Sequence, residues 1–418
     1  MARERWDVIV MGGGPAGTTA ATLLARYGYE VLLVEKEAFP RFHTGESLLP
    51  TIWEIWTRLG IVDRIDAMRN IKKQGILFNL FGESEHLYRV AEFAEYFVRP
   101  YTHNVIRAEY DLMLLNVSKE SGVTVRQPAM VREVLFDGDR PIGVVIVEPD
   151  GACSRAFAPI IVDATGRASL LARRLKLRHP DPKLNKVAYF THFTGCRRDK
   201  GDAEGTQLNY AIEGGWIWFI PLRGNLESVG AVMDIEFIRT HSATEPQKFF
   251  AEVMACCPPI AERLAGATQV MDVKVISSLS YISDHFVGDG FVCIGDATTF
   301  IDPMFSSGVY FAHKAGEIAA DTIHEGFRKG DFSAQLLSRY EEKMRVPMSG
   351  MFPLIYNWYE LLRNPHGAIN IFALAERAPL LRRSLTLIFS GGYNLVELKQ
   401  LLERAREIAA SLQSVPSA

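Results

Sequence analysis

Cysteine is scarce in this chain, and its few positions match no metal or disulfide pattern. The five cysteines among 418 residues are an odd number, and no pair has the CxxC spacing. The ten histidines are scattered, without an HExxH or similar arrangement. Structural zinc sites and disulfide frameworks depend on such spacings. We therefore expect no metal and a set of reduced thiols, which favours a cytoplasmic location.

Membrane-spanning runs and basic clusters are missing too. No apolar run reaches the roughly 18 residues that a membrane helix needs. The sequence opens into an apolar strand and a glycine loop, which we interpret as leaving no room for a signal peptide. Lys and Arg number 46 against 49 Asp and Glu, a formal net charge of −3, and no basic stripe favours nucleic acid as a partner. What remains is typical of a globular chain with roughly two or three domains.

The N-terminal region has the pattern strand, glycine turn, helix, strand. An apolar run at 7–11 is followed by GGGPAG, by the helical pattern TTAATLLARYG and by a second apolar run, VLLVE. This order predicts a βαβ dinucleotide unit, in which a diphosphate lies at the helix N-terminus. Gly12 permits the tight turn, Gly14 lets the backbone approach the diphosphate, and Gly17 lets the helix pack on the strand. Glu35 ends the second strand, where it would accept ribose hydroxyls and repel a 2′-phosphate, which disfavours NADP.

Two later stretches favour FAD over NAD. DATGRAS begins at Asp163 after an apolar run, and a predicted buried strand from 291 ends at Gly295-Asp296. An acid after a strand-end glycine can bind ribityl or ribose hydroxyls. The helix predicted to open at Ser307-Gly308 offers free amides and a positive dipole end to an anion.

With these motifs the chain resembles the flavoprotein monooxygenase superfamily, whose FAD sites combine an N-terminal GxGxxG with a late GD motif. The resemblance implies an α/β fold: a Rossmann-like FAD-binding domain of the para-hydroxybenzoate-hydroxylase type, an antiparallel β-sheet substrate domain and a short helical C-terminal region. Arg107 resembles the arginine that meets the cofactor in that superfamily. Its alternative is a surface ion pair with Glu109 or Asp111 of the same helix.

The expected domains follow this resemblance. The discontinuous FAD-binding domain would comprise 1–75, 101–183 and 281–331, and the substrate domain 76–100 and 184–280, where alternating patterns indicate antiparallel strands. Residues 332–418 would form the helical region, with breaks at Pro365 and Gly391-Gly392. The expected cofactor-binding residues are Gly12, Gly14, Pro15, Ala16, Gly17, Glu35, Lys36, Arg41, Ser47, Arg107, Asp163, Gly295, Asp296 and Gly308.

The stretch GGWIWFIPLRG, 214–224, is unusually aromatic. Alternate side chains on both faces of the predicted strand are apolar, so the stretch by itself favours an ordinary aromatic core. Its residues 216–221, however, match the WxWxIP motif of the flavin-dependent halogenases. RFHTGESLLP at 41–50 and IDPMFSSG at 301–308 resemble two loops of the same enzymes. Related geranylgeranyl reductases carry a variant with tyrosine first and phenylalanine before the proline, so this chain resembles the halogenases over about residues 5 to 330.

The resemblance implies that different residues bind the halide and separate the flavin from the organic substrate. Reduced FAD and oxygen would form a flavin hydroperoxide, which chloride or bromide would attack to give hypohalous acid. The halide would bind the backbone amides of Ser307 and Gly308. A partition between flavin and organic substrate would be built from Trp216, Trp218, Ile220 and Pro221. Because no second GxGxxG marks an NAD(P)H domain, a separate flavin reductase would supply FADH2.

Hypohalous acid would then be guided by a lysine. In phenolic and pyrrolic halogenases that lysine stands two residues before a glycine, and Lys73-Gln74-Gly75 fits this spacing. Lys72 would face the other way in an extended segment; the alternative for the doublet is solvated surface. Tryptophan halogenases carry a glutamate where this chain has Phe305. The resemblance therefore favours phenolic, pyrrolic or carrier-protein-tethered aromatic substrates.

The prediction from sequence is an FADH2-dependent halogenase with Lys73 as its catalytic residue. The alternatives are an FAD-dependent monooxygenase or geranylgeranyl-reductase-like oxidoreductase, and a flavin-binding protein without enzymatic activity. The identity of the substrate, the halide, the position attacked and the oligomeric state are not predicted.

Overall fold

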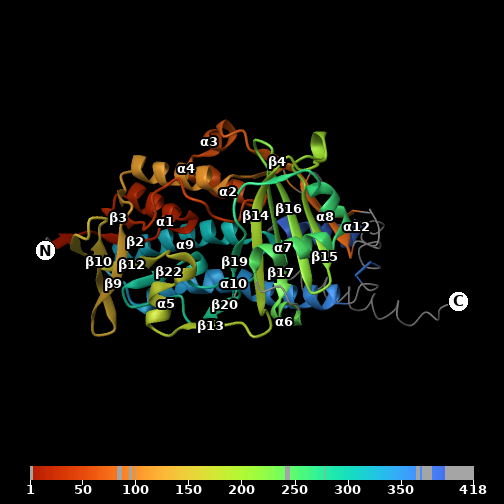
Figure 1. The fold of residues 1–418 in the computed structure, drawn as a ribbon. Helices are drawn as coiled ribbons and strands as arrows, with labels where there is room; N and C mark the ends of the chain where they lie inside the picture. Colours follow the sequence, from red (N-terminus) through yellow and green to blue (C-terminus); the bar gives the residue numbers. More distant parts are fainter. Residues whose placement is uncertain are drawn as a thin grey trace.

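The computed structural model describes residues 3–81, 87–93, 97, 99–240, 245–277, 279–363, 368–369 and 379–390. Two large sheets occupy opposite halves of the molecule, and the helices α9 (Gly308–Lys329) and α10 (Ala334–Leu362) run lengthwise beside them (Figure 1). This mixed α/β architecture, with a helical C-terminal region, confirms the predicted fold class. Helix α10, which contacts β21 of the first sheet and Trp216 of the second, therefore connects the two halves.

The first sheet has six strands and follows the predicted dinucleotide-binding pattern. All neighbours are parallel except the edge pair β21 and β22. Alternate side chains of the central strand face opposite layers: Val8 and Val10 pack toward the helices, and Ile9 and Met11 toward a small sheet. In order, the strands are β21 (Val287–Gly288), β22 (Phe291–Cys293), β12 (Ile160–Asp163), β2 (Val8–Met11), β3 (Val31–Val34) and β8 (Thr124–Arg126).

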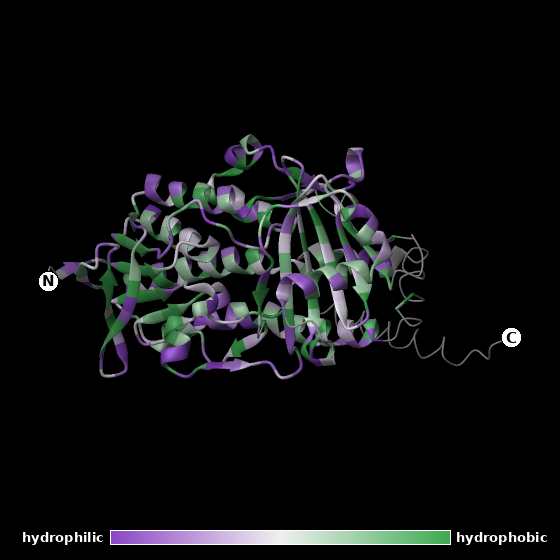
Figure 2. Cartoon of the chain, in the orientation of Figure 1, coloured by the Kyte–Doolittle hydropathy of each residue, from purple (hydrophilic) through white to green (hydrophobic). Residues whose placement is uncertain are grey.

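Helices cover one face of this sheet and the small sheet covers the other. Helix α1 (Pro15–Arg26) packs between α9 and α4 (Arg107–Glu120). In Figure 2 the sheet strands are largely green, and purple gathers on outer helices such as α3 (Val62–Ala67). The small sheet has the order β1 (Arg3–Arg5), β11 (Cys153–Phe157), β10 (Arg140–Val147) and β9 (Met130–Asp137).

The second large sheet has eight strands and carries the aromatic motif near its centre. It is antiparallel except where β15 and β5 run parallel. One face packs on α7 (Pro246–Ala255) and α8 (Pro258–Leu264), and the other faces α10. The strands are β18 (Thr268–Gln269), β14 (Lys186–Thr194), β17 (Leu226–Asp234), β16 (Gly215–Leu222), β15 (Gln207–Ile212), β5 (Gly75–Leu80) and β6 (Tyr88–Glu92), with β19 (Lys274–Ile276) beside β14.

Shorter elements complete the described chain. They are α2 (Ile52–Leu59), β4 (Ile71–Lys73), β7 (Thr102–Asn104), α5 (Leu170–Arg174), β13 (Arg178–Pro180), α6 (Ile235–Thr240), β20 (Tyr281–Ser283) and α12 (Pro379–Ser390), of which α12 packs on β6. Helix α10 runs through Pro347 and Pro353 without ending. The predicted breaks at Pro365 and Gly391-Gly392 lie outside the described residues. In the part of the chain that is described, no helix is long and apolar enough to cross a membrane. The domain division stays a prediction.

Candidate active site

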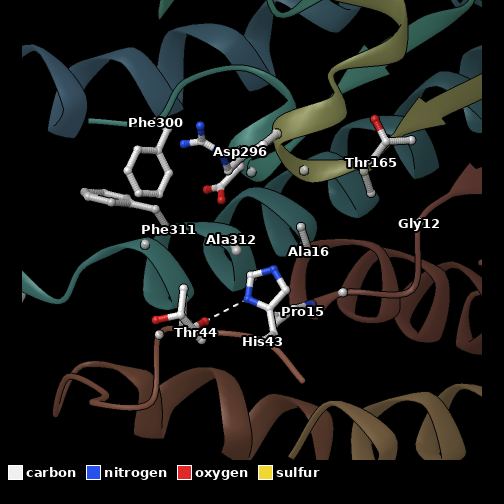
Figure 3. Close-up of a pocket in the computed structure, with 18 of the residues that line it drawn as sticks. Gly12, Pro15, Ala16, His43, Thr44, Thr165, Asp296, Phe300, Phe311 and Ala312 are labelled. Carbon is white, nitrogen blue, oxygen red and sulfur yellow. Dashed lines mark hydrogen bonds between the residues drawn. The ribbon is translucent and has the colours of Figure 1, made fainter. Parts of the chain in front are cut away.

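A cavity of about 610 Å³ lies between the two halves, at the carboxyl ends of β2, β3, β12 and β22. Ligands of open parallel sheets bind at this edge, outside the strand ends. The cavity walls come from the glycine loop, the 41–47 loop, the 164–170 segment and the 294–312 segment (Figure 3). On the far side the wall is one face of β16.

The glycine loop is shaped by close backbone approaches. Gly12 has φ +108°, and a Cβ there would lie 2.3 Å from the carbonyl oxygen of Ala164. A Cβ on Gly17 would lie 2.0 Å from the carbonyl oxygen of Gly12. Gly12, Gly14, Pro15 and Ala16 line the cavity, whereas Gly17 only lets α1 pack against the loop. Because α1 begins at Pro15 without a side-chain cap, its first amides face the cavity as an anion site.

The acid at the end of β3 both holds the loop and borders the cavity. Glu35 accepts hydrogen bonds from the backbone amides of Gly13 at 2.7 Å and Glu37 at 2.8 Å. It lines the cavity together with Lys36, whose side chain is exposed. The structure therefore places Glu35 where the sequence predicted it, at the rim that a ribose would meet.

Two arginines share one buried aspartate beside the cavity. Arg107 forms two hydrogen bonds of 2.9 Å with the Asp111 carboxylate, and Arg41 adds a third, also 2.9 Å. Arg107 also donates to the carbonyl oxygen of Thr44. Burial alone would raise the pKa of Asp111, but the charge and hydrogen bonds of Arg107, together with the charge of Arg41, outweigh it and hold this pKa below its usual value. Arg107 is thus buried in an ion pair with Asp111, not on the surface, and both arginines line the cavity.

The two acids of the later motifs differ in placement. Asp163 does not line the cavity: its carboxylate accepts hydrogen bonds from Thr165 and from the backbone amide of Leu171. Asp296 does line the cavity and points into it (Figure 3), and no described residue donates to its carboxylate. Burial raises the pKa of Asp296 to about 6, against the opposing charges of Arg167 and Arg107. The geometry favours Asp163 as a support for its loop and Asp296 as a ligand.

The predicted halide loop ends at the start of α9. Ser307 is the N-cap residue, makes no side-chain capping bond, and is followed by Gly308, next to which a Cβ would meet nothing within 4 Å. Both residues line the cavity. A long helix that begins there presents free backbone amides and a partial positive charge to an anion. Ser47, from the loop before α2, lines the cavity as well.

The two indoles of the aromatic motif belong to the cavity wall, whereas their neighbours belong to the core. Trp216, Trp218 and Ile220 line the cavity, and Ile217 and Phe219 pack on the opposite face against α7 and α8. Ring centroids of the two indoles are 5.8 Å apart. Pro221 does not line the cavity; its carbonyl oxygen accepts a 3.0 Å hydrogen bond from Asn104. One face of the strand therefore belongs to the cavity wall and the other to the hydrophobic core.

Lys73 is completely buried and lies behind the cavity wall. Its Nζ donates to the carbonyl oxygen of Leu48 and to Oε1 of Gln207, each at 3.2 Å, and it does not line the cavity. Burial lowers the pKa of Lys73 to about 7. The alternative of solvated surface is wrong for Lys73, whereas Lys72 faces outward as predicted.

Several residues of this site were not predicted. Gln207 contacts the lysine and lines the cavity. Tyr359 accepts a hydrogen bond from the Trp216 indole at 2.9 Å. Gly230 makes room for the second indole, since a Cβ there would lie 2.2 Å from the Trp218 ring. Gln207 and Tyr359 are distant in sequence from the residues they contact, Gly230 lies on the strand after the motif, and no local motif marks any of the three.

The family model described as an FAD binding domain matches residues 5–348. The 1H-pyrrole-2-carbonyl peptidyl-carrier-protein chlorinase of Pseudomonas fluorescens is 31% identical over 439 aligned residues, covering 100% of this chain and 96% of that protein. The chain belongs to the flavin-dependent halogenases. This halogenase also matches the structure of the myxobacterial chondrochloren halogenase, with a TM-score of 0.81 and 31% identity, covering 96% of this chain and 97% of the other. A flavoprotein/dehydrogenase from Cytophaga hutchinsonii matches with a TM-score of 0.87 and 27% identity, covering 98% and 99%.

The halogenase is thus an FAD-dependent oxidoreductase, and its cavity fits the cofactor. The tight approaches at Gly12 and Gly17 leave space only for backbone, as a diphosphate cradle requires. The free carboxylate of Asp296 supplies a hydrogen-bond acceptor for hydroxyls inside the same cavity. Arg41 and Arg107 add positive charge beside it.

Proposed function

We propose that this halogenase transfers chloride or bromide, as hypohalous acid, to a phenolic or pyrrolic ring that is free or tethered to a carrier protein. FADH2 reaches it from a separate flavin reductase in the cytoplasm. One observation carries the proposal. A single cavity is bordered by the nucleotide loop, the N-terminus of α9 and the indoles of β16, and the buried amine of Lys73 lies one hydrogen bond beyond it.

The stoichiometry of the halogenation defines which reactants the protein must bind and direct. When bound, reduced FAD supplies two electrons and two protons, so that, with these, oxygen, one halide and one further proton become hypohalous acid and water. The aromatic ring then gains the halogen and loses a proton, releasing a second water. The chain must therefore hold the halide, keep the ring away from the flavin and direct the hypohalous acid.

The residues present suit each of these tasks. The backbone amides at Ser307 and Gly308 would hold the halide by hydrogen bonds and the helix dipole, without a full positive charge. Trp216 and Trp218 are buried and fixed by hydrogen bonds to Tyr359 and Ser228, so their rings would exclude a substrate ring from the cavity. Lys73 would bind or accept the halogen, because its lowered pKa leaves much of the amine unprotonated near neutral pH.

The test is a product assay with matched lysine variants. The purified protein is supplied with FADH2 from a flavin reductase, oxygen and chloride or bromide. Phenols, pyrroles and indoles are offered as free acids and as carrier-protein thioesters. We expect halogenated product, loss of that product in Lys73→Ala, and retention in Lys72→Ala, since Lys72 is exposed. The proposal is refuted if no substrate is halogenated, or if NAD(P)H alone reduces the bound flavin and the ring is hydroxylated.

A further inference from the structure

The side-chain oxygen of Gln207 joins the cavity to Lys73. Three donors converge on Oε1: Ser47 Oγ at 2.7 Å, Ser306 Oγ at 3.0 Å and Lys73 Nζ at 3.2 Å. Gln207 is 1% exposed and is the first residue of β15. The three donors come from the loop before α2, the loop before α9 and strand β4. One atom therefore links three segments that surround the cavity.

The amide of Gln207 is held in this orientation from its other end. Its Nε2 donates to Oδ1 of Asn209 at 3.0 Å, two residues along the same face of β15. Because the amide NH2 can only donate, this bond turns the oxygen toward the lysine and the two serines. The orientation follows from the chain and needs no ligand.

More hydrogen-bond donors point at this oxygen than it has lone pairs. A carbonyl oxygen has two lone pairs, whereas Ser47, Ser306 and Lys73 all point at it. The lysine bonds are the long ones, at 3.2 Å, and the amine also lies 5.7 Å from the centroid of the Phe93 ring. A small polar molecule that arrives from the cavity can take over one of these donors without leaving it unpaired.

Gln207 also stands at the boundary of the partition. Gln207, Ser47 and Ser306 line the cavity, but Lys73 does not. Leu208 pairs with Phe219 across the two strands, which puts Gln207 beside Ile220 at the end of the indole wall. Phe305, one residue before Ser306, is buried against Trp358 and Phe389 and offers no polar group.

We infer that Gln207 is a positioning residue that aims the amine of Lys73 at the cavity and forms the polar opening through which hypohalous acid reaches it. This inference rests on the proposed function. A neutral acceptor suits the task because it orients the amine without stabilising its protonated form. A carboxylate in the same place would pair with the ammonium group and withdraw the lone pair that reacts with halogen.

Two variants and a control test the inference. Gln207→Leu removes the acceptor, Gln207→Glu replaces it with a carboxylate of the same shape, and Gln74→Leu makes the first change next to the lysine but outside the cluster. Substrate halogenation is measured per FADH2 oxidised, and escaping hypohalous acid is captured with a 1,3-diketone. We expect Gln207→Leu to lose on the order of tenfold to a hundredfold in ring halogenation while released hypohalous acid increases. Gln74→Leu should behave as the unmodified protein.

A second measurement does not depend on the flavin reaction. The titration of Lys73 is followed by NMR with isotope-labelled lysine, its signal being identified by its absence in Lys73→Arg. We expect Gln207→Glu to move the midpoint upward by about one pH unit or more, and any limb of the pH profile of halogenation that reports Lys73 to move with it. An unchanged midpoint in Gln207→Glu, or unchanged product yield in a folded Gln207→Leu, overturns the inference. If the midpoint moves but the unmodified protein halogenates nothing, the contact of Gln207 with the amine stands and the proposed function fails.

Discussion

Removing one hydroxyl from α10 should loosen the indole wall. The hydroxyl of Tyr359 accepts a hydrogen bond from Trp216 Nε1 at 2.9 Å and donates one to Asp302 Oδ2 at 3.0 Å. Trp216 and Asp302 are 1% and 4% exposed, so bulk water has little access to the groups that lose their partner. Tyr359→Phe therefore leaves two buried polar groups unpaired, at about 1 to 3 kcal/mol each. We expect the free energy of unfolding to fall by about 2 to 6 kcal/mol.

The penalty should depend on pH through Asp302. Burial raises the pKa of Asp302 to about 6, and the hydrogen bond from Tyr359 opposes that rise. Without the hydroxyl, this pKa rises further, because the ionised form loses more than the neutral form. The difference in stability between Tyr359→Phe and the unmodified protein should consequently grow as the pH increases from about 5 to about 8.

A neighbouring tyrosine provides the matched control. Tyr356, one helical turn earlier in α10, donates a 2.5 Å hydrogen bond to Asp181 and does not touch the indoles. Tyr356→Phe should cost about 1 kcal/mol. Urea unfolding, followed by circular dichroism at both ends of the pH range, measures all three proteins. The reasoning is refuted if Tyr359→Phe is no less stable than Tyr356→Phe, or if its deficit does not grow with pH.

Three further predictions concern the wall, the cofactor and acid stability. Gly230→Ala should destabilise the protein by about 1 to 3 kcal/mol, because its Cβ would lie 2.2 Å from the Trp218 ring; unchanged thermal unfolding would contradict this. Asp296→Ala should weaken FAD binding on the order of tenfold or more in fluorescence titration, without lowering the free energy of unfolding. Asp163→Ala should instead lower the free energy of unfolding, because the Asp163 carboxylate accepts hydrogen bonds within its own loop. The opposite ranking of the two variants would refute the roles assigned to these acids. Because the folded-state pKa of Asp302 is raised to about 6 from 3.8, its contribution is fully present below about pH 4 and is lost as the pH rises through 6. This loss is about 3 kcal/mol, and Asp302→Asn should remove that part of the pH dependence in urea unfolding.

Local sequence patterns predicted many of the strands and helices that surround this site. The order strand, GGGPAG, helix and strand produced β2, α1 and β3, because each step depends on neighbouring residues. The strand that ends at Gly295-Asp296 and the helix that opens after Ser307 were predicted for the same reason. Alternation along β16 also indicated that Trp216 and Trp218 share one face.

Sequence patterns indicated less where side chains meet across the fold. Asp163 was predicted to bind the cofactor; its carboxylate accepts hydrogen bonds from Thr165 and Leu171 of the loop that follows it, and its contact with the cofactor stays a prediction. Lys73 was singled out because its spacing from a glycine resembles that of the halogenase lysine. Whether either lysine of the doublet is solvated depends on which residues pack on it in the folded protein. Gln207 and Tyr359 carried no signal at all, since their partners lie 134 and 143 residues away along the chain.

The resemblance to the halogenases pointed to Lys73, and the sequence by itself determined the βαβ unit, the late glycine-acid motif and the alternating strand with two indoles. These features are set by backbone turn requirements and by the periodicity of apolar residues, which act over a few positions. Only the tertiary structure decided that the indoles border the cavity, that Lys73 is buried with a lowered pKa, and that Gln207 connects the two. Burial and hydrogen-bond partners arise when distant strands pack together, and the pKa and orientation of a buried amine depend on those partners.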